Sequence, residues 1–135
     1  MLKGNRCYME ENWQHAEFYY REAEDVLNAQ WFADQASDEL LMAWICANHN
    51  LATLFETTGH YREALKYLLQ PHERLTTIVR AKTSCNAIKT VAIKALSKTL
   101  EPINLFKKKH NVCEECVATL LKLSATKAHR NAIIH

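Results

Sequence analysis

The side chains best suited to chemistry lie in one short segment, His110-x-x-Cys113-x-x-Cys116. Imidazole nitrogens and thiolates are good zinc ligands, and a gap of two residues suits chelation of a single ion. A structural zinc site needs four ligands, however, and the chain has no second Cys/His pair of comparable spacing. Glu114 or His129 would complete the set only if folding happened to bring it close. A metal site at His110, Cys113 and Cys116 is therefore an alternative prediction.

The two cysteines of this segment have two further interpretations. On a helix, Cys113, Cys116 and Leu120 share one face, and cysteine is often buried as a small hydrophobic residue. A redox pair at this spacing is typical of a thioredoxin-like βαβ unit, for which the sequence gives no sign. We favour packing in the core and keep the metal site and the redox pair as alternatives. The 5 cysteines are odd in number and irregularly spaced, so a disulfide framework is not expected.

Other catalytic signatures are missing from the sequence. It contains no glycine-rich phosphate loop, no Gly-x-Ser-x-Gly and no His-Glu-x-x-His. Acidic neighbours such as Glu10 and Glu11 are expected to be solvated charges rather than an acid–base pair. The basic stretch of residues 82–109 has Phe106 as its only aromatic residue, which argues against nucleic-acid binding. We predict a protein that is not an enzyme and has no cofactor.

Helices must position these residues. The chain of 135 residues has only 2 Gly and 2 Pro, whereas sheets need many turns rich in both. Apolar residues recur at spacings of three and four, and Phe18 is assigned to the inward face of its helix. The pattern predicts helices over residues 2–10, 13–28, 38–57, 61–79, 84–99 and 112–123.

Several residues mark where these helices should begin, bend or end. Ser37 is a plausible N-cap, and Gly59 should end a helix by adopting positive φ. Periodicity continues past Pro71, which predicts a kinked helix or two abutting helices. We assign residues 30–36, with Trp31 folded back, to a loop. Pro102 could start a further turn, and residues 107–110 would form a basic connector.

Two segments of the chain resemble each other. Each has a small residue, an aromatic residue, a turn, a second aromatic residue, an alanine and a large residue, namely Gly4, Tyr8, Trp13, Ala16 and Tyr20, and then Ala52, Phe55, Gly59, Tyr61, Ala64 and Leu68. Small residues let two antiparallel helices approach closely, and large ones fill the space between repeats. This pattern resembles the tetratricopeptide repeat. Glu11 stands where the turn glycine is usual in the first unit.

The resemblance implies an all-α fold, a tetratricopeptide-like superhelix of antiparallel helix pairs with about six or seven helices. Residues 1–135 would form one domain. Repeat-like units would cover residues 1–30 and 38–70, and a degenerate third pair with a capping helix would cover residues 84–135. The chain also resembles a small family of uncharacterised bacterial proteins with this fold, from which no activity carries over.

In tetratricopeptide arrays, the first helix of each pair builds a concave wall that holds a peptide. The resemblance implies a wall that includes Asn5, Met9, Cys46, His49, Thr53, Glu56 and Thr57. Members that grip a C-terminal carboxylate use asparagines and lysines. Asn5 and Asn50 match the asparagine positions, and Lys89 is the best candidate lysine, but Met1 stands where the first lysine is expected.

Each of these wall residues also has a structural interpretation. Asn5 and Asn50 could cap a helix or bond between helices, and His49 could be a partly buried packing histidine. The functional prediction is an adaptor or chaperone-like scaffold, a non-catalytic module that binds a partner peptide or helix in a concave groove. The alternative is a metal- or thiol-dependent protein that uses His110, Cys113 and Cys116.

Charge is segregated along the chain. Residues 1–79 carry 6 Lys and Arg against 12 Asp and Glu, a net charge of −6, while residues 80–135 carry 11 against 3, a net charge of +8. Two solvated faces would explain this, but it would also favour an antiparallel homodimer. The N-terminal residues lack the apolar run of a signal peptide, and no long uncharged apolar stretch occurs. We therefore expect a cytoplasmic protein without a membrane partner, and the resemblance to the uncharacterised bacterial family implies that it is bacterial.

Overall fold

A computed structural model describes residues 1–82 and 84–122, and throughout this part the regular structure is helical. The predicted all-α class is confirmed. The helices are α1 (Leu2–Met9), α2 (Trp13–Ala33), α3 (Asp38–Thr57), α4 (Tyr61–Arg80) and α5 (Asn86–His110). Residues 114–122 are also helical, and we call them the terminal segment. None of the helices within the described ranges is both long and apolar enough to cross a membrane.

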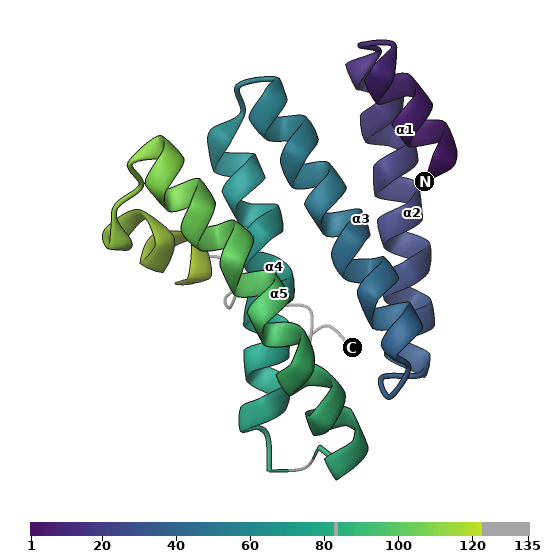
Figure 1. Cartoon of the computed structure of the whole chain (residues 1–135), viewed down its shortest axis with the longest axis vertical. Coiled ribbons are helices and arrows are strands. Elements are labelled where there is room, and N and C mark those ends of the chain that lie inside the picture. The colour runs from purple at the N-terminus through teal and green to yellow at the C-terminus, as the bar shows by residue number, and fades with distance from the viewer. Residues whose placement is uncertain (83, 123–135) are drawn as a thin grey trace.

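Consecutive helices pack side by side as antiparallel pairs (Figure 1). Contacts run mainly between neighbours in the sequence, from α1 to α2, α2 to α3, α3 to α4 and α4 to α5, whereas α3 and α5 barely touch. Such nearest-neighbour packing is typical of helical repeat proteins. Because both α3 and α5 pack on α4, their facing sides are left free to line a groove.

The first helix of every pair ends in the same kind of turn. Glu11, Gly59 and Asn111 have positive φ, at 58°, 81° and 55°. The following backbone N–H bonds to the carbonyl five residues back in each turn, as Asn12 to Cys7, His60 to Phe55 and Val112 to Lys107, at 2.8, 2.8 and 3.1 Å. This is the longer bond of a Schellman motif. The turns lie at residues 11, 59 and 111, spacings of 48 and 52, so α5 and the terminal segment form a third pair.

α2 is longer than the sequence predicts. The structure corrects the loop assigned to residues 30–36, because α2 continues to Ala33 and carries Trp31 on its inner face. Only 1% of Trp31 is exposed, and its ring stacks on Trp44 with centroids 4.8 Å apart and planes 15° apart. The Arg74 guanidinium covers both indoles, at 5.0 and 5.4 Å from their centroids. Burial of this large ring favours the extra helical turn.

Both prolines lie inside continuous helices. Pro71 lies in α4, and Pro102 lies in α5, which continues to His110. The expected connector at residues 107–110 is therefore wrong, because these residues are the basic last turn of α5, where cations complement the helix dipole. A proline removes one hydrogen bond from a helix. Pro71 is fully buried, so packing of the long helix offsets that loss.

Two clusters of buried side chains form the core. One holds Tyr20, Leu51, Leu65 and Phe106, and the other holds Trp31, Trp44, Leu75 and Ala92. Gly4 lies against the Tyr20 ring, as the small-residue pattern predicts for a close helix contact. Phe18 is a correction: 60% of its surface is exposed, although the periodicity assigns it to the inner face.

Candidate functional site

A groove of about 600 Å3 opens between α3 and α5, with α4 behind it. α3 contributes mostly polar side chains to it, and α5 contributes apolar and basic ones. The lining consists of His49, Ala52, Thr53, Glu56, Thr57, Tyr61, Leu68, Pro102, Leu105, Phe106, Lys109 and His110.

The polar wall of the groove follows from a spacing of four residues along α3. His49, Thr53 and Thr57 share one face of the helix. Each threonine donates its hydroxyl to the carbonyl four residues earlier, Thr53 to His49 at 2.9 Å and Thr57 to Thr53 at 2.8 Å. Thr57 also meets the Tyr8 hydroxyl of α1, at 2.9 Å. These bonds fix the rotamers of the hydroxyls, which keep lone pairs free to accept a further hydrogen bond.

Glu56 joins the two sides of the groove at one end. Its Oε1 atom accepts a hydrogen bond from Lys109 Nζ at 2.8 Å and lies 3.1 Å from His110 Nε2. Burial alone would raise the pKa of Glu56, but the hydrogen bonds and positive charges of Lys109 and His110 outweigh it and hold the pKa below its usual value. The carboxylate is therefore ionised near neutral pH and ties α3 to α5.

His49 lies in the polar wall and is mostly shielded from solvent. Burial lowers the pKa of its imidazole, which favours the neutral ring near pH 7. Its Nε2 atom is buried and has no hydrogen-bond partner within residues 1–82 and 84–122. The His49 side chain is thus partly buried, as the packing interpretation predicts, and it also lines the groove.

An aromatic partition separates this groove from a second pocket. His110 packs against Tyr61 and Phe106, with ring centroids 4.4 and 4.5 Å apart. The three side chains line both cavities. On the far side of the partition, a pocket of about 550 Å3 is bounded by Leu65 of α4 and by Cys113 and Cys116, among others.

The two cysteines of this second pocket are not core residues. Both are exposed, so the favoured interpretation of Cys113 and Cys116 as packing residues is wrong. Their side chains project from the start of the terminal segment, where its helix begins at residue 114. Within the part of the chain that the structure describes, no three His, Cys, Asp or Glu side chains are grouped to hold a metal ion. His110 turns its Nε2 atom to Glu56 instead.

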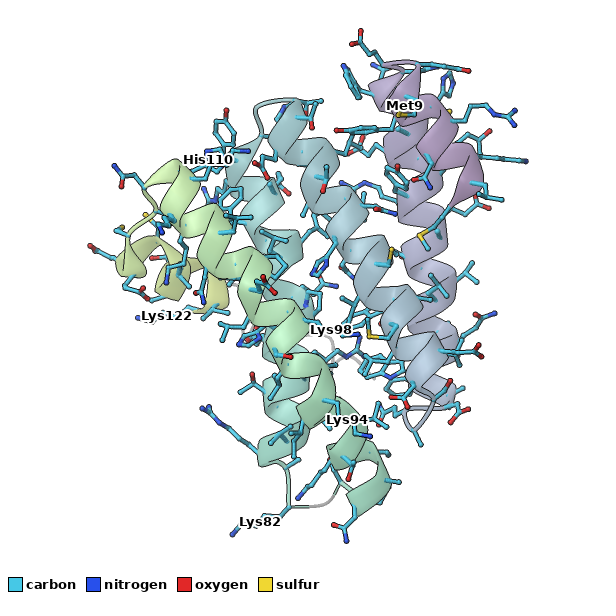
Figure 2. The ribbon with its side chains drawn as sticks, viewed as in Figure 1. Met9, Lys82, Lys94, Lys98, His110 and Lys122 are labelled. Atoms are coloured by element: carbon cyan, nitrogen blue, oxygen red, sulfur yellow. The ribbon has the colours of Figure 1, made fainter. Side chains whose placement is uncertain are left out.

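Four of the wall residues named from the sequence meet in the groove, namely His49, Thr53, Glu56 and Thr57. The others do not line it. Met9 is 80% exposed on α1, well separated from His110 at the end of α5 (Figure 2). Cys46 is exposed elsewhere on α3. Lys89 lies in the first turn of α5, at the other end of that helix from His110.

The proposed asparagine pair is not equivalent in the repeat. When the units are aligned on Glu11 and Gly59, Asn5 corresponds to Thr53, six residues before the turn, and Asn50 corresponds to Leu2. Each asparagine also has a local partner. Asn5 Oδ1 accepts from the Tyr20 hydroxyl at 2.6 Å, and Asn50 Nδ2 lies 3.3 Å from Met1 Sδ. These bonds match the structural interpretation of the two residues.

Sequence reasoning misses the whole α5 side of the groove. Leu105, Phe106 and Lys109 belong to it, but they fall in the stretch assigned to a turn and a connector. Asn111 was the available signal, because asparagine tolerates the left-handed conformation better than most residues. Aligning Asn111 with Gly59 would have shown that Leu105 occupies the position in the third pair that Thr53 occupies in the second.

Comparison with known proteins adds one finding. A family model described as a protein of unknown function (DUF2753) matches residues 1–134. The chain matches no curated protein and no solved structure.

Proposed function

We propose that this chain, which belongs to the DUF2753 family, is a tetratricopeptide-like interaction module that holds a segment of a partner protein between α3 and α5. The observation that carries the proposal is the groove itself, about 600 Å3 in volume and open along two helices. A volume in this range accommodates a few side chains of a peptide. The module would act as an adaptor or chaperone-like scaffold in the cytoplasm.

The repeated turns support this proposal. Within residues 1–82 and 84–122, three helix pairs each have one residue in the left-handed conformation at the turn, namely Glu11, Gly59 and Asn111. In a stack of such pairs the first helices form the inner wall, and α3 and α5 are two of these first helices. The groove therefore lies where the resemblance to tetratricopeptide arrays predicts peptide binding.

The chemistry of the lining indicates what the partner segment should carry. Leu105 is an exposed apolar side chain beside Phe106, so an apolar anchor residue would bury surface there. Thr53 and Thr57 face it with hydroxyl oxygens that can accept backbone N–H groups. Because Glu56 already pairs with Lys109 and His110, the groove favours a segment whose apolar residues, rather than its charges, enter it.

A photo-cross-linking experiment tests the proposal. A benzophenone amino acid is placed at Leu105 in the groove or, as a control, at Ile93, another exposed apolar residue of α5 that does not line the groove. Both proteins are irradiated in the producing cells. A partner segment that cross-links to position 105 and not to position 93 is the expected result.

A synthetic peptide of that segment is then titrated against the purified protein. Leu105→Glu should weaken binding at least about tenfold, since it places a charge against the apolar anchor, while Ile93→Glu should leave it unchanged. Equal cross-linking from both positions, or normal peptide binding by Leu105→Glu, would refute the proposal. Cross-linking of position 105 to a second copy of the chain would identify the predicted homodimer as the occupant instead.

A further inference from the structure

A pair of thiols lies at the start of the terminal segment. Cys113 and Cys116 are both exposed, and their Sγ atoms are 3.0 Å apart. The backbone N–H of Cys116 donates to Cys113 Sγ at 3.4 Å. Since the helix begins at residue 114, Cys113 holds the N-cap position, where a sulfur anion is stabilised by free backbone N–H groups.

The two thiols differ in acidity. The side-chain contact with Cys116 and the hydrogen bond that Cys113 Sγ accepts from the Cys116 backbone N–H both lower the pKa of Cys113. The same contact raises the pKa of Cys116. Cys113 is therefore suited to attack as a thiolate, and Cys116 is suited to follow as a thiol.

Packing does not explain these cysteines. Aligned on the turn residues Gly59 and Asn111, Cys113 corresponds to Tyr61 and Cys116 corresponds to Ala64. Ala64 is fully buried between helices, whereas Cys116 is exposed. Close contact between helices therefore explains the small residue at position 64, but it does not explain the small residue Cys116 at the equivalent position of the third pair.

We propose that Cys113 and Cys116 are a redox-active dithiol that exchanges with a low-molecular-weight disulfide of the glutathione type. The site goes beyond the binding groove proposed above and does not depend on it. The neighbouring pocket of about 550 Å3 would receive the disulfide. Its walls include Arg62, which can pair with a carboxylate of such a molecule, and Leu65, Phe106 and Leu120, which can pack against the methylene groups beside its sulfur atoms.

The exchange proceeds in two balanced steps. The Cys113 thiolate attacks one sulfur of the disulfide, the disulfide bond breaks, and the released thiolate takes a proton from water. The Cys116 thiol then loses its proton to water and attacks Cys113 Sγ in the mixed disulfide, which expels the second small thiol after protonation. One external disulfide is reduced to two thiols, and the two electrons come from the cysteine pair, which becomes a disulfide.

The test incubates the reduced full-length protein with mixtures of glutathione and glutathione disulfide. The reaction is quenched with acid, free thiols are alkylated, and peptides are identified by mass spectrometry. The expected product is a bridge between Cys113 and Cys116 that glutathione reverses. Cys116→Ser should stop at a mixed disulfide of Cys113 with glutathione. This product should form at least about tenfold faster at neutral pH than the one at exposed Cys85, because Cys113 Sγ accepts the backbone N–H of residue 116, whereas Cys85 stands at the start of α5 without a capping hydrogen bond to its side chain.

Cys113→Ser removes the proposed nucleophile, and Cys85→Ser is its matched control, since both cysteines are exposed. Cys113→Ser should abolish the bridge, and Cys85→Ser should leave it intact, with unchanged circular dichroism in both. The proposal is overturned if Cys113 and Cys85 react at the same rate, if no reversible bridge forms, or if the protein purifies with stoichiometric zinc that blocks alkylation of the pair.

Discussion

Glu11 and Gly59 have the same left-handed backbone conformation, with φ of 58° and 81°, in turns that join the helices of successive pairs. Glycine adopts this conformation without steric cost, whereas a residue with a Cβ atom is strained. The fold thus imposes the turn on Glu11, although the side chain disfavours it.

Relief of this strain is the first prediction. Glu11→Gly should raise the free energy of unfolding by about 0.5–1 kcal/mol, because strain in the turn outweighs the extra entropy of glycine in the unfolded chain. Gly59→Ala should lower it by about 1 kcal/mol. A Cβ atom at position 59 meets nothing within 4 Å, so the loss would come from the backbone alone. Urea unfolding measures both changes, provided that the variants and the wild type have equal m-values. A Glu11→Gly protein that is less stable than the wild type would show that Glu11 is not strained.

Close packing of α1 on α2 gives the second prediction. A Cβ atom on Gly4 would lie 2.7 Å from two carbons of the Tyr20 ring. Gly4→Ala should therefore lower the free energy of unfolding by about 1–3 kcal/mol, although alanine favours a helix over glycine. In a Tyr20→Leu background the loss should shrink or change sign. The double-mutant cycle measures the coupling, and strictly additive effects would argue against the contact.

The third prediction compares adjacent aromatic residues at the end of α2. Trp31 is 1% exposed and Phe32 is 66% exposed. Trp31→Ala should lower the free energy of unfolding by about 3–5 kcal/mol, whereas Phe32→Ala should change it by less than about 0.5 kcal/mol. Thermal and urea unfolding followed by circular dichroism give both values. Similar losses for the two variants would mean that the stack on Trp44 does not stabilise the fold.

The fourth prediction concerns pH. The pKa of Glu56 is lower in the folded protein than in the unfolded chain, despite its burial, because Lys109 and His110 bond to it. A carboxyl with a lowered pKa stabilises the fold above its unfolded pKa and loses this effect as the pH falls through the folded pKa. Glu56→Gln should therefore be less stable than wild type at pH 7, by about 0.5–1 kcal/mol.

The difference between the two proteins should shrink as the pH is lowered from about 5 to about 3. Urea unfolding at a series of pH values measures it. Glu17→Gln is a useful control, because Glu17 forms a partly exposed pair with Arg21, four residues later on α2, at 3.2 Å, and a pair of this kind contributes little. A difference that stays constant across this pH range would rule out the carboxylate of Glu56 as its source.

Local signals predict the middle of the fold well. The expected helix over residues 38–57 coincides with α3, because Ser37 accepts a hydrogen bond from the Leu40 N–H at 3.2 Å and Gly59 closes the other end. Helix caps and glycine turns depend on a few neighbouring residues, so they can be predicted from a short stretch of sequence. Tertiary contacts decide the rest: Trp31 extends α2 by stacking on a residue 13 positions away.

The groove could be predicted only on one side for the same reason. The resemblance to the tetratricopeptide repeat implies that His49, Thr53 and Thr57 belong to the inner wall, and their spacing of four puts them on one face of a single helix. The opposite wall depends on α5 continuing through Pro102, and proline normally ends a helix interior. The sequence also did not show how the third pair aligns with the first two. That alignment depends on the left-handed conformation of Asn111, which asparagine adopts only in some contexts.

The partition of Tyr61, Phe106 and His110 is a wall that the two cavities share. Each of these side chains contributes one surface to the groove and another to the second pocket, which Cys113 and Cys116 bound. A molecule that repositions them from one side changes the shape available on the other. Linkage requires the effect to be reciprocal, so a groove occupant that shifts the dithiol–disulfide equilibrium must itself bind with a different affinity to the oxidised chain.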